Sequence, residues 1–255
     1  LSKILAMGSF PKQLIKPVTL FFLLHITVIS WTSFMNVKDP IILFLTVAIY
    51  HQIFLLKETF SFKYLFLLFL LCYMMLISRF YVLFAIFISV GTFIFFEFKI
   101  NWVKKILFIM FVMLLFRIFA YEKIMGSVHF LALGPSLIFG AVRFLLTPMP
   151  LSISENYGFL FIDSIVTWCF FLFFLIGGVT IFIRYKYLRP LILHLIILTI
   201  VYGAVPDQQG PRYRFQLSFI IVTCQFMGLR VIFEQSPHLL RLIQKKLQIK
   251  ILQLN

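Results

Sequence analysis

Charged residues are scarce in this chain. Only 12% of its 255 residues are Asp, Glu, Lys or Arg, and acids are the rarest, 8 against 23 basic residues. Soluble domains carry about 25% charged residues, so this composition excludes an ordinary soluble domain. Several apolar runs approach ~18 residues, enough to cross a hydrocarbon layer ~30 Å thick. The alternating polarity of a membrane β-barrel is absent. The sequence therefore predicts an all-α, polytopic membrane protein.

Cysteine is also rare, and familiar catalytic motifs are missing. Cys72, Cys169 and Cys224 each lie inside an apolar run, with no disulfide or metal-ligand spacing. No Gly-rich phosphate loop, HExxH or Gly-x-Ser-x-Gly pattern occurs. We therefore expect no metal and no cofactor. The net charge of +15 is interpreted as a sign of membrane topology, with no nucleic-acid partner.

The apolar runs predict about eight transmembrane helices. They are Pro17–Met35, Pro40–Leu56, Tyr64–Ile77, Phe80–Phe96, Trp102–Ala120, Phe159–Ile183, Pro190–Val205 and Phe215–Phe233. The third and fourth are short and joined only by Ser78-Arg79, so one of them is expected to be broken or tilted. A ninth stretch, Phe130–Leu146, contains glycines, a proline and Arg143 and ends at Thr147-Pro148. We expect it to be a re-entrant or interfacial helix.

Basic residues predict the orientation. With the N-terminus in the cytoplasm and Phe130–Leu146 not crossing, most of the basic residues fall on the cytoplasmic side, and most of these are Lys. The chain is then a multi-pass membrane protein with both termini cytoplasmic. Residues 1–235 form a single transmembrane domain. Residues 236–255 have apolar residues at helical spacing and a basic face, which predicts an amphipathic tail on anionic lipid.

Arginine dominates the basic residues that this orientation leaves outside. They are Lys38, Arg79, Arg117, Lys123, Arg143, Arg212 and Arg214. Topology needs only positive charge, whereas a planar, forked donor suits two-point binding of phosphate or carboxylate. These arginines are therefore candidates for chemistry. The alternative is that they reach toward lipid headgroups or pair with nearby acids.

The segment DQQGPRYRF, from Asp207 to Phe215, separates the last two predicted spans. Gly210-Pro211 suits a turn, but a turn does not require Arg-x-Arg. In extended backbone Arg212 and Arg214 would face the same side and hold a pyrophosphate together. Asp207 is a candidate base, metal ligand or Arg partner. The alternative is a charged turn that simply ends two helices.

Further candidates lie earlier in the chain. Arg143 stands one turn before the break at Thr147-Pro148, and Glu155 is the only acid of the loop that follows. Arg79 interrupts apolar sequence, so its partner is expected to be Glu155, Asp163, Asp207 or a bound anion. His129 lies directly before the stretch Phe130–Leu146 and is a candidate general base.

These residues resemble a known family. VRFLLTPMP, then a span ending in IRYKYLRP, then VYGAVPDQQGPRYRFQLSFIIV, are similar to the C-terminal half of bacterial O-antigen or capsule polymerases and related lipid-carrier-dependent glycosyltransferases. Gly210, Arg212 and Arg214 match an Arg-x-Arg group in the late outer loop. Arg143, Pro148 and Pro150 match an earlier pattern, and SRFYV around Arg79 resembles a mid-chain segment. The chain is shorter than usual and lacks a long acidic first outer loop.

The resemblance implies an enzyme of cell-surface polysaccharide assembly in the bacterial inner (cytoplasmic) membrane. Its donor is an undecaprenyl-pyrophosphate-linked oligosaccharide used on the non-cytoplasmic side, with other envelope-polysaccharide proteins as partners. Arg79, Arg143, Arg212 and Arg214 would bind the pyrophosphate, and Asp207, Glu155 or His129 would act as the catalytic base. Two alternatives stay open. One is a transporter or flippase for an anionic lipid-linked sugar, and the other is a non-catalytic subunit of a larger assembly.

Overall fold

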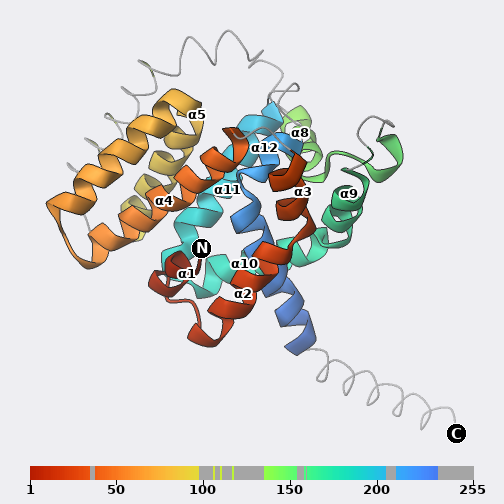
Figure 1. The fold of residues 1–255 in the computed structure, drawn as a ribbon, viewed down its shortest axis with the longest axis horizontal. Helices are drawn as coiled ribbons and strands as arrows, with labels where there is room; N and C mark the ends of the chain where they lie inside the picture. The colour runs from red at the N-terminus through yellow and green to blue at the C-terminus, as the bar shows by residue number, and fades with distance from the viewer. Residues whose placement is uncertain are drawn as a thin grey trace, which may run out of the picture.

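The computed structural model describes residues 1–34, 38–97, 106, 110, 117, 135–153, 158, 160–204 and 211–234, and the regular elements among them are all helices (Figure 1). They are α1 (Ser2–Met7), α2 (Lys12–Leu24), α3 (Ile26–Phe34), α4 (Lys38–Glu58), α5 (Phe62–Glu97), α8 (Pro135–Leu146), η2 (Pro150–Ser152), α9 (Leu160–Cys169), α10 (Phe171–Arg184), η4 (Lys186–Leu188), α11 (Arg189–Ala204), α12 (Pro211–Phe215) and a helix at 218–234.

Prolines lie in the first turn of four of these helices. Pro40, Pro135, Pro190 and Pro211 begin or nearly begin α4, α8, α11 and α12. A helix's first amides lack acceptors within the helix, so proline is tolerated there, and its fixed φ suits the helical turn. Proline also ends a helix before it, and α8 stops at Leu146, just before Thr147-Pro148, as predicted.

Three helices are long and apolar enough to cross a membrane: Lys38–Glu58, Phe62–Phe96 and Lys186–Ala204. α9 and α10 together provide a fourth candidate if the pair forms one span. The two helices meet at a bend of 56°. The all-α class is therefore confirmed, and three or four candidate spans in the part of the chain described suggest a multi-pass membrane protein. The finer number of eight stays a prediction. The predicted span 102–120 lies outside the described residues except at 106, 110 and 117, and the tail 236–255 lies wholly outside them.

Three predicted spans can be compared closely with the structure. The first, Pro17–Met35, is broken at His25, whose backbone is extended with ψ 130°, so it forms two shorter helices, α2 and α3. The third and fourth predicted spans together form α5. Their helical run is interrupted at Arg79, between the two predicted spans, by non-helical backbone angles of φ −154° and ψ 86°. Arg79 lies where the chain turns back.

Contacts of α4 with both halves of α5 establish this reversal. Arg79 Nη2 donates to Asp39 Oδ1, at the start of α4, over 2.6 Å. Ten residues later, Ser89 lies 2.8 Å from the hydroxyl of Tyr50, eleven residues along α4. The second half of α5 therefore runs beside α4 in the same direction, away from Asp39. The first half approaches from the opposite direction, as Figure 1 shows.

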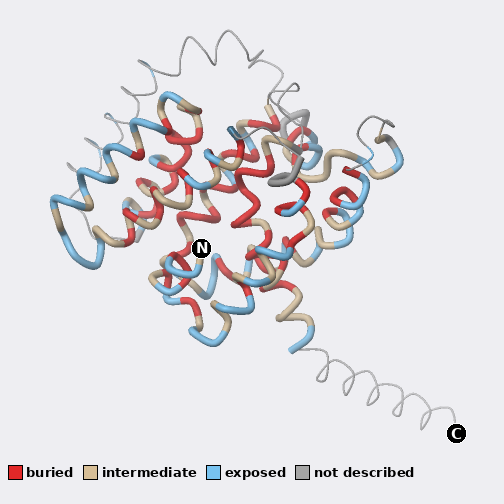
Figure 2. The backbone as a smooth tube through the Cα atoms, viewed as in Figure 1, coloured by how far each residue is buried: buried red, intermediate tan, exposed pale blue. Residues whose placement is uncertain are grey.

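α11 lies at the centre of the bundle and packs against α5, α8 and α10. Figure 2 shows the buried residues gathered along it and on the facing sides of its neighbours, with exposed residues on the outer side of α5. Close approach depends on glycine at two contacts. A Cβ at Gly203 would lie 2.5 Å from the backbone nitrogen of Ala141 in α8, and one at Gly228 would lie 1.9 Å from the carbonyl oxygen of Phe173 in α10. Such small residues allow helix backbones to touch in membranes.

The two ends of the bundle differ in charge chemistry. At one end, Lys57 Nζ lies 3.0 Å from the ring centroid of Tyr187, which places the end of α4 beside the start of α11. Lys186 and Arg189 belong to the same end. The opposite ends of α4 and α11 meet around Asp39 and Tyr202, where arginines and acids gather. The assignment of these two ends to opposite sides of a membrane stays a prediction.

Candidate functional site

Asp39 joins two arginines that are far apart in the sequence. Its Oδ1 accepts from Arg79 Nη2 and its Oδ2 from Arg212 Nε, each over 2.6 Å. Asp39 and Arg79 are buried, with 1% and 7% exposure, whereas Arg212 is 42% exposed. One carboxylate therefore holds the start of α4, the break in α5 and α12 together. We call Asp39, Arg79 and Arg212 the Asp39 cluster.

The sequence interpretation missed Asp39. It assigned Arg79 to Glu155, Asp163, Asp207 or an anion, and the structure corrects this to Asp39. The signal was nevertheless present. In a chain with 8 acids, an Asp directly before a proline and an apolar run is unusual, and burial of a carboxylate requires a cationic partner.

Tyrosines surround the Arg79 side of the cluster. The Arg79 guanidinium carbon lies 4.8 Å from the ring centroid of Tyr213, and the rings of Tyr213 and Tyr202 are 5.2 Å apart. Tyr202 is fully buried and accepts a hydrogen bond from the Gln216 side chain. A guanidinium over an aromatic face is attracted by the ring quadrupole. Arg79 Nη1 is buried and has no hydrogen-bond partner among the described residues.

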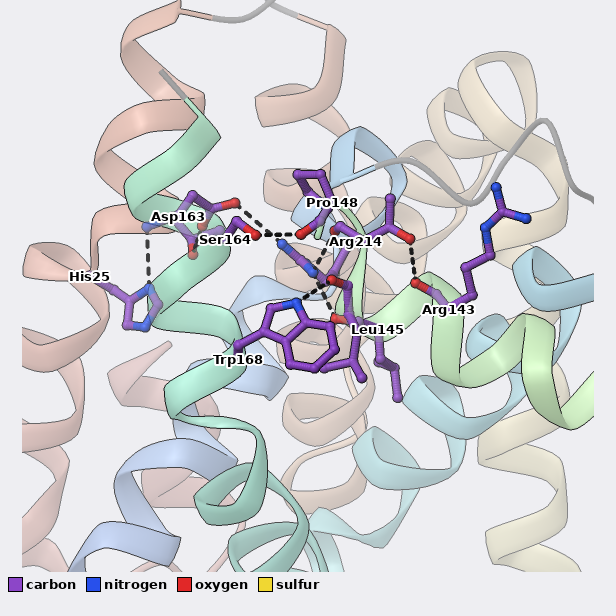
Figure 3. A network of polar contacts seen from close by, with 11 residues as sticks. His25, Arg143, Leu145, Pro148, Asp163, Ser164, Trp168 and Arg214 are labelled. Carbon is purple, nitrogen blue, oxygen red and sulfur yellow. Dashed lines mark hydrogen bonds and ion pairs between the residues drawn. The ribbon is translucent and has the colours of Figure 1, made fainter. Parts of the chain in front are cut away.

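Arg214 forms a second, separate pair with Asp163 (Figure 3). Its Nη2 lies 3.2 Å from Asp163 Oδ2, and its Nη1 donates to the carbonyl oxygens of Leu145 and Thr147 over 2.7 and 2.9 Å. Asp163 also accepts from the Thr27 hydroxyl. Burial lowers the pKa of the Arg214 guanidinium, and the Asp163 charge opposes that shift. This buried pair ties α12 to α8, α9 and α3.

The expectation that Arg212 and Arg214 face the same side is wrong. It assumed extended backbone, but Pro211–Phe215 is the short helix α12. Successive helical residues are rotated by ~100°, so residues two apart point in nearly opposite directions. Arg212 therefore reaches Asp39, and Arg214 reaches Asp163. The Arg-x-Arg group divides between two acids.

Arg143 is exposed in the last turn of α8. Its carbonyl oxygen accepts from the Thr147 hydroxyl over 2.6 Å, while its side chain extends away from Arg214 in Figure 3. The structure therefore brings Arg79 and Arg212 together, with Arg214 on the other side of α12 and Arg143 on an outer face. The predicted bases Asp207, Glu155 and His129 lie outside the described residues.

A small polar cavity of about 20 Å³ adjoins Arg214. Three buried atoms of its lining residues have no partner among the described residues: His25 Nε2, Ser218 Oγ and Gln225 Oε1. A polar space of more than ~10–15 Å³ with two to four polar partners suits one water molecule. Sequence reasoning missed this feature because its residues come from segments 25–27, 145, 167–174 and 214–225.

Metal ligands do not gather in the described part of the chain. No group of three or more His, Cys, Asp or Glu side chains there is placed to hold a metal ion. The chemical groups that the site offers are guanidinium groups: three buried or half-buried arginines face two carboxylates.

Comparison with known proteins identifies no family, since no protein-family model, curated protein or solved structure matches this chain.

Proposed function

We propose that this protein is a membrane glycosyltransferase or polymerase. It takes a glycan from an undecaprenyl-pyrophosphate-linked donor on the non-cytoplasmic side of the membrane, in cell-surface polysaccharide assembly. The observation that carries the proposal is the Asp39 cluster, where Arg79 and Arg212 converge on one acid at the Arg-rich end of the bundle. The resemblance of residues 142–150 and 201–222 to bacterial polysaccharide polymerases supplies the reaction class.

The proposed chemistry uses guanidinium groups to stabilise a leaving group. An acceptor hydroxyl attacks the anomeric carbon of the donor sugar, and the bond from that carbon to the pyrophosphate oxygen breaks. The pyrophosphate leaves with the electron pair, while a base takes the hydroxyl proton. Preorganised donors aimed at developing negative charge are a large source of rate enhancement. Asp207, Glu155 and His129 stay the candidates for the base.

Different arginines take different roles in this proposal. Arg212 is 42% exposed and leaves Asp39 at little cost, so it contacts the diphosphate first. Arg79 Nη1 is buried and unpartnered within the described residues, which suits a donor reserved for a ligand. Arg143 stands exposed at the end of α8 to bind the outer phosphate or sugar. Arg214 is satisfied by the protein and acts as a positioning residue for α12.

A transporter for the same lipid-linked sugar is less well supported. It requires polar groups at mid-depth that line a path. Polar side chains do occur there, but Tyr50 bonds Ser89 over 2.8 Å and its ring lies against His194 at 5.6 Å. These groups pack against one another within the core. A non-catalytic subunit remains the other alternative, and no contact among the described residues favours it.

Reconstitution tests the proposal directly. The purified protein is placed in liposomes with undecaprenyl-pyrophosphate-linked oligosaccharide from the source bacterium, and glycan length and released undecaprenyl pyrophosphate are measured. We expect longer glycans and carrier release in equal numbers. Movement of the intact donor across the bilayer without extension would indicate the transporter instead. Extension only after a second membrane protein is added would indicate the subunit.

A further inference from the structure

A second site lies toward the other end of the bundle. A groove of about 450 Å³ runs between α1, the 44–52 part of α4 and the first half of α5. Its floor is mainly apolar, with Ala48 and Leu71 among the lining residues, and its polar groups are Ser2, Lys3, His51 and Gln52. Residues 44–52 cover ~12 Å of helix, enough for a segment of a lipid chain.

Two polar atoms in this groove lack a partner among the described residues. They are His51 Nε2 and Gln52 Oε1, both buried. Gln52 is 7% exposed, and its carbonyl oxygen accepts no hydrogen bond from a described residue. Burial of such a group without a partner is unusual. The pair marks a place where a ligand donates a hydrogen bond.

Charge and position indicate the class of ligand. Lys3 lines the groove beside His51 and Gln52, which lie in the half of α4 that leads to Lys57. That is the Lys-rich end, where anionic headgroups are attracted by basic side chains. The outer face of α5 exposes Phe66, Phe69 and Ile77, so the groove opens beside a surface suited to lipid.

We propose that this groove binds one anionic phospholipid whose headgroup carries hydroxyl groups, as in phosphatidylglycerol. One acyl chain lies along Ala48 and Leu71. The phosphate lies near Lys3, and a headgroup hydroxyl donates to Gln52 Oε1. This lipid is separate from the glycan donor of the proposed function, because the Asp39 cluster lies at the opposite end of α4. The assignment holds even if the chemistry at that cluster is different.

Photo-crosslinking tests this site in the full chain. The protein is reconstituted with phosphatidylglycerol that carries a diazirine on one acyl chain, irradiated, and mapped by peptide mass spectrometry. We expect labelling concentrated on residues 44–52 and on Leu67 and Leu71, and reduced several-fold when unlabelled phosphatidylglycerol competes. Phosphatidylcholine, which lacks the net negative charge and the hydroxyl donors, should compete several-fold less well. Equal competition by the two lipids would overturn the proposal.

Two variants separate the groove from lipid that merely surrounds the protein. Ala48→Trp fills the groove, and Ile196→Trp places the same bulk on an exposed position of α11. Labelling of 44–52 should fall several-fold in Ala48→Trp and stay unchanged in Ile196→Trp. Lys3→Gln, which leaves the core intact, should reduce the preference for phosphatidylglycerol over phosphatidylcholine. Uniform labelling of every exposed helix face in the unaltered protein would show ordinary surrounding lipid and reject the site.

Discussion

Arg212 donates to Asp39 across 173 positions of sequence, with Nε and Oδ2 2.6 Å apart. This contact brings the final part of the chain against the start of α4. Because Asp39 also holds Arg79, removal of one carboxylate leaves two guanidinium groups close together without compensation. The stability of this end of the bundle and the placement of the proposed binding groups therefore depend on the same acid.

Asp39→Asn should destabilise the protein strongly. Breaking a buried ion pair by removing one partner costs about 3–5 kcal/mol. Thermal unfolding in detergent should show a clearly lower transition temperature, with part of the loss recovered in Asp39→Asn/Arg79→Gln. Glu234→Gln is the matched control, since its pair with Arg230 is exposed and contributes about 0–1 kcal/mol. Equal losses in the two variants would contradict a central role for Asp39.

Arg212→Ala should reduce glycan extension by about 10–100-fold and lower the unfolding temperature less than Asp39→Asn does, because Asp39 keeps its pair with Arg79. A hydrogen bond from Arg212 to the charged diphosphate is expected to contribute about 1.5–3 kcal/mol. The Arg212 side chain is 42% exposed, so it can reach a ligand. Arg212→Lys should recover only part of the rate, because Lys lacks the forked donor geometry. Arg230→Ala, in an arginine outside the cluster whose partner is the exposed Glu234, provides the control. Full activity in Arg212→Ala would remove this residue from the proposed site.

Arg214→Lys should lower stability more than Arg143→Lys. Arg214 uses Nη1 for two carbonyl oxygens and Nη2 for Asp163, and a lysine ammonium cannot reproduce that fork. Arg143 is exposed, so the same substitution there keeps its charge at little cost. A double-mutant cycle of Arg214→Gln with Asp163→Asn should give a coupling of about 0.5–3 kcal/mol. Additive effects would mean that the pair does not contribute.

Gly177→Ala should be much more damaging than Gly178→Ala. A Cβ at Gly177 would lie 1.7 Å from the carbonyl oxygen of Cys224, whereas a Cβ at Gly178 would lie an ordinary 3.9 Å from Cys224 Sγ. Backbone atoms cannot move aside cheaply, so α10 and the helix at 218–234 must separate. Yield of folded protein and unfolding temperature measure the difference. Similar behaviour of the two variants would show that the helices are not in such close contact.

Cysteine labelling should place the two ends of the bundle on opposite sides of the membrane. In a background where Cys72, Cys169 and Cys224 are replaced by Ala, a membrane-impermeant maleimide should label Arg212→Cys in intact cells. Lys186→Cys should react only after permeabilisation, because Lys-rich segments stay in the cytoplasm. Labelling of both positions from the same side would rule out the proposed orientation and the non-cytoplasmic reaction with it.

Much of the candidate site was visible in the sequence as residues without partners. Scarce charge made each arginine in apolar sequence conspicuous, and Arg79, Arg212 and Arg214 do occupy buried or half-buried ion pairs. Their partners were not predictable, since Asp39 and Asp163 lie 40 and 51 residues from Arg79 and Arg214. Electrostatic pairing in a core follows distance in space, and nothing in local spacing encodes it. The roles of Asp207, Glu155 and His129 as candidate bases stay predictions.

Composition and apolar run length alone determined the all-α class and the candidate membrane spans, because the cost of exposing backbone and charge to hydrocarbon depends on local sequence. Tertiary structure decided which acid each arginine meets, that Arg212 and Arg214 diverge, and that a groove opens beside Ala48. These outcomes depend on how helices pack, and packing is set by contacts such as that of Gly203 with Ala141, which join residues far apart in the chain.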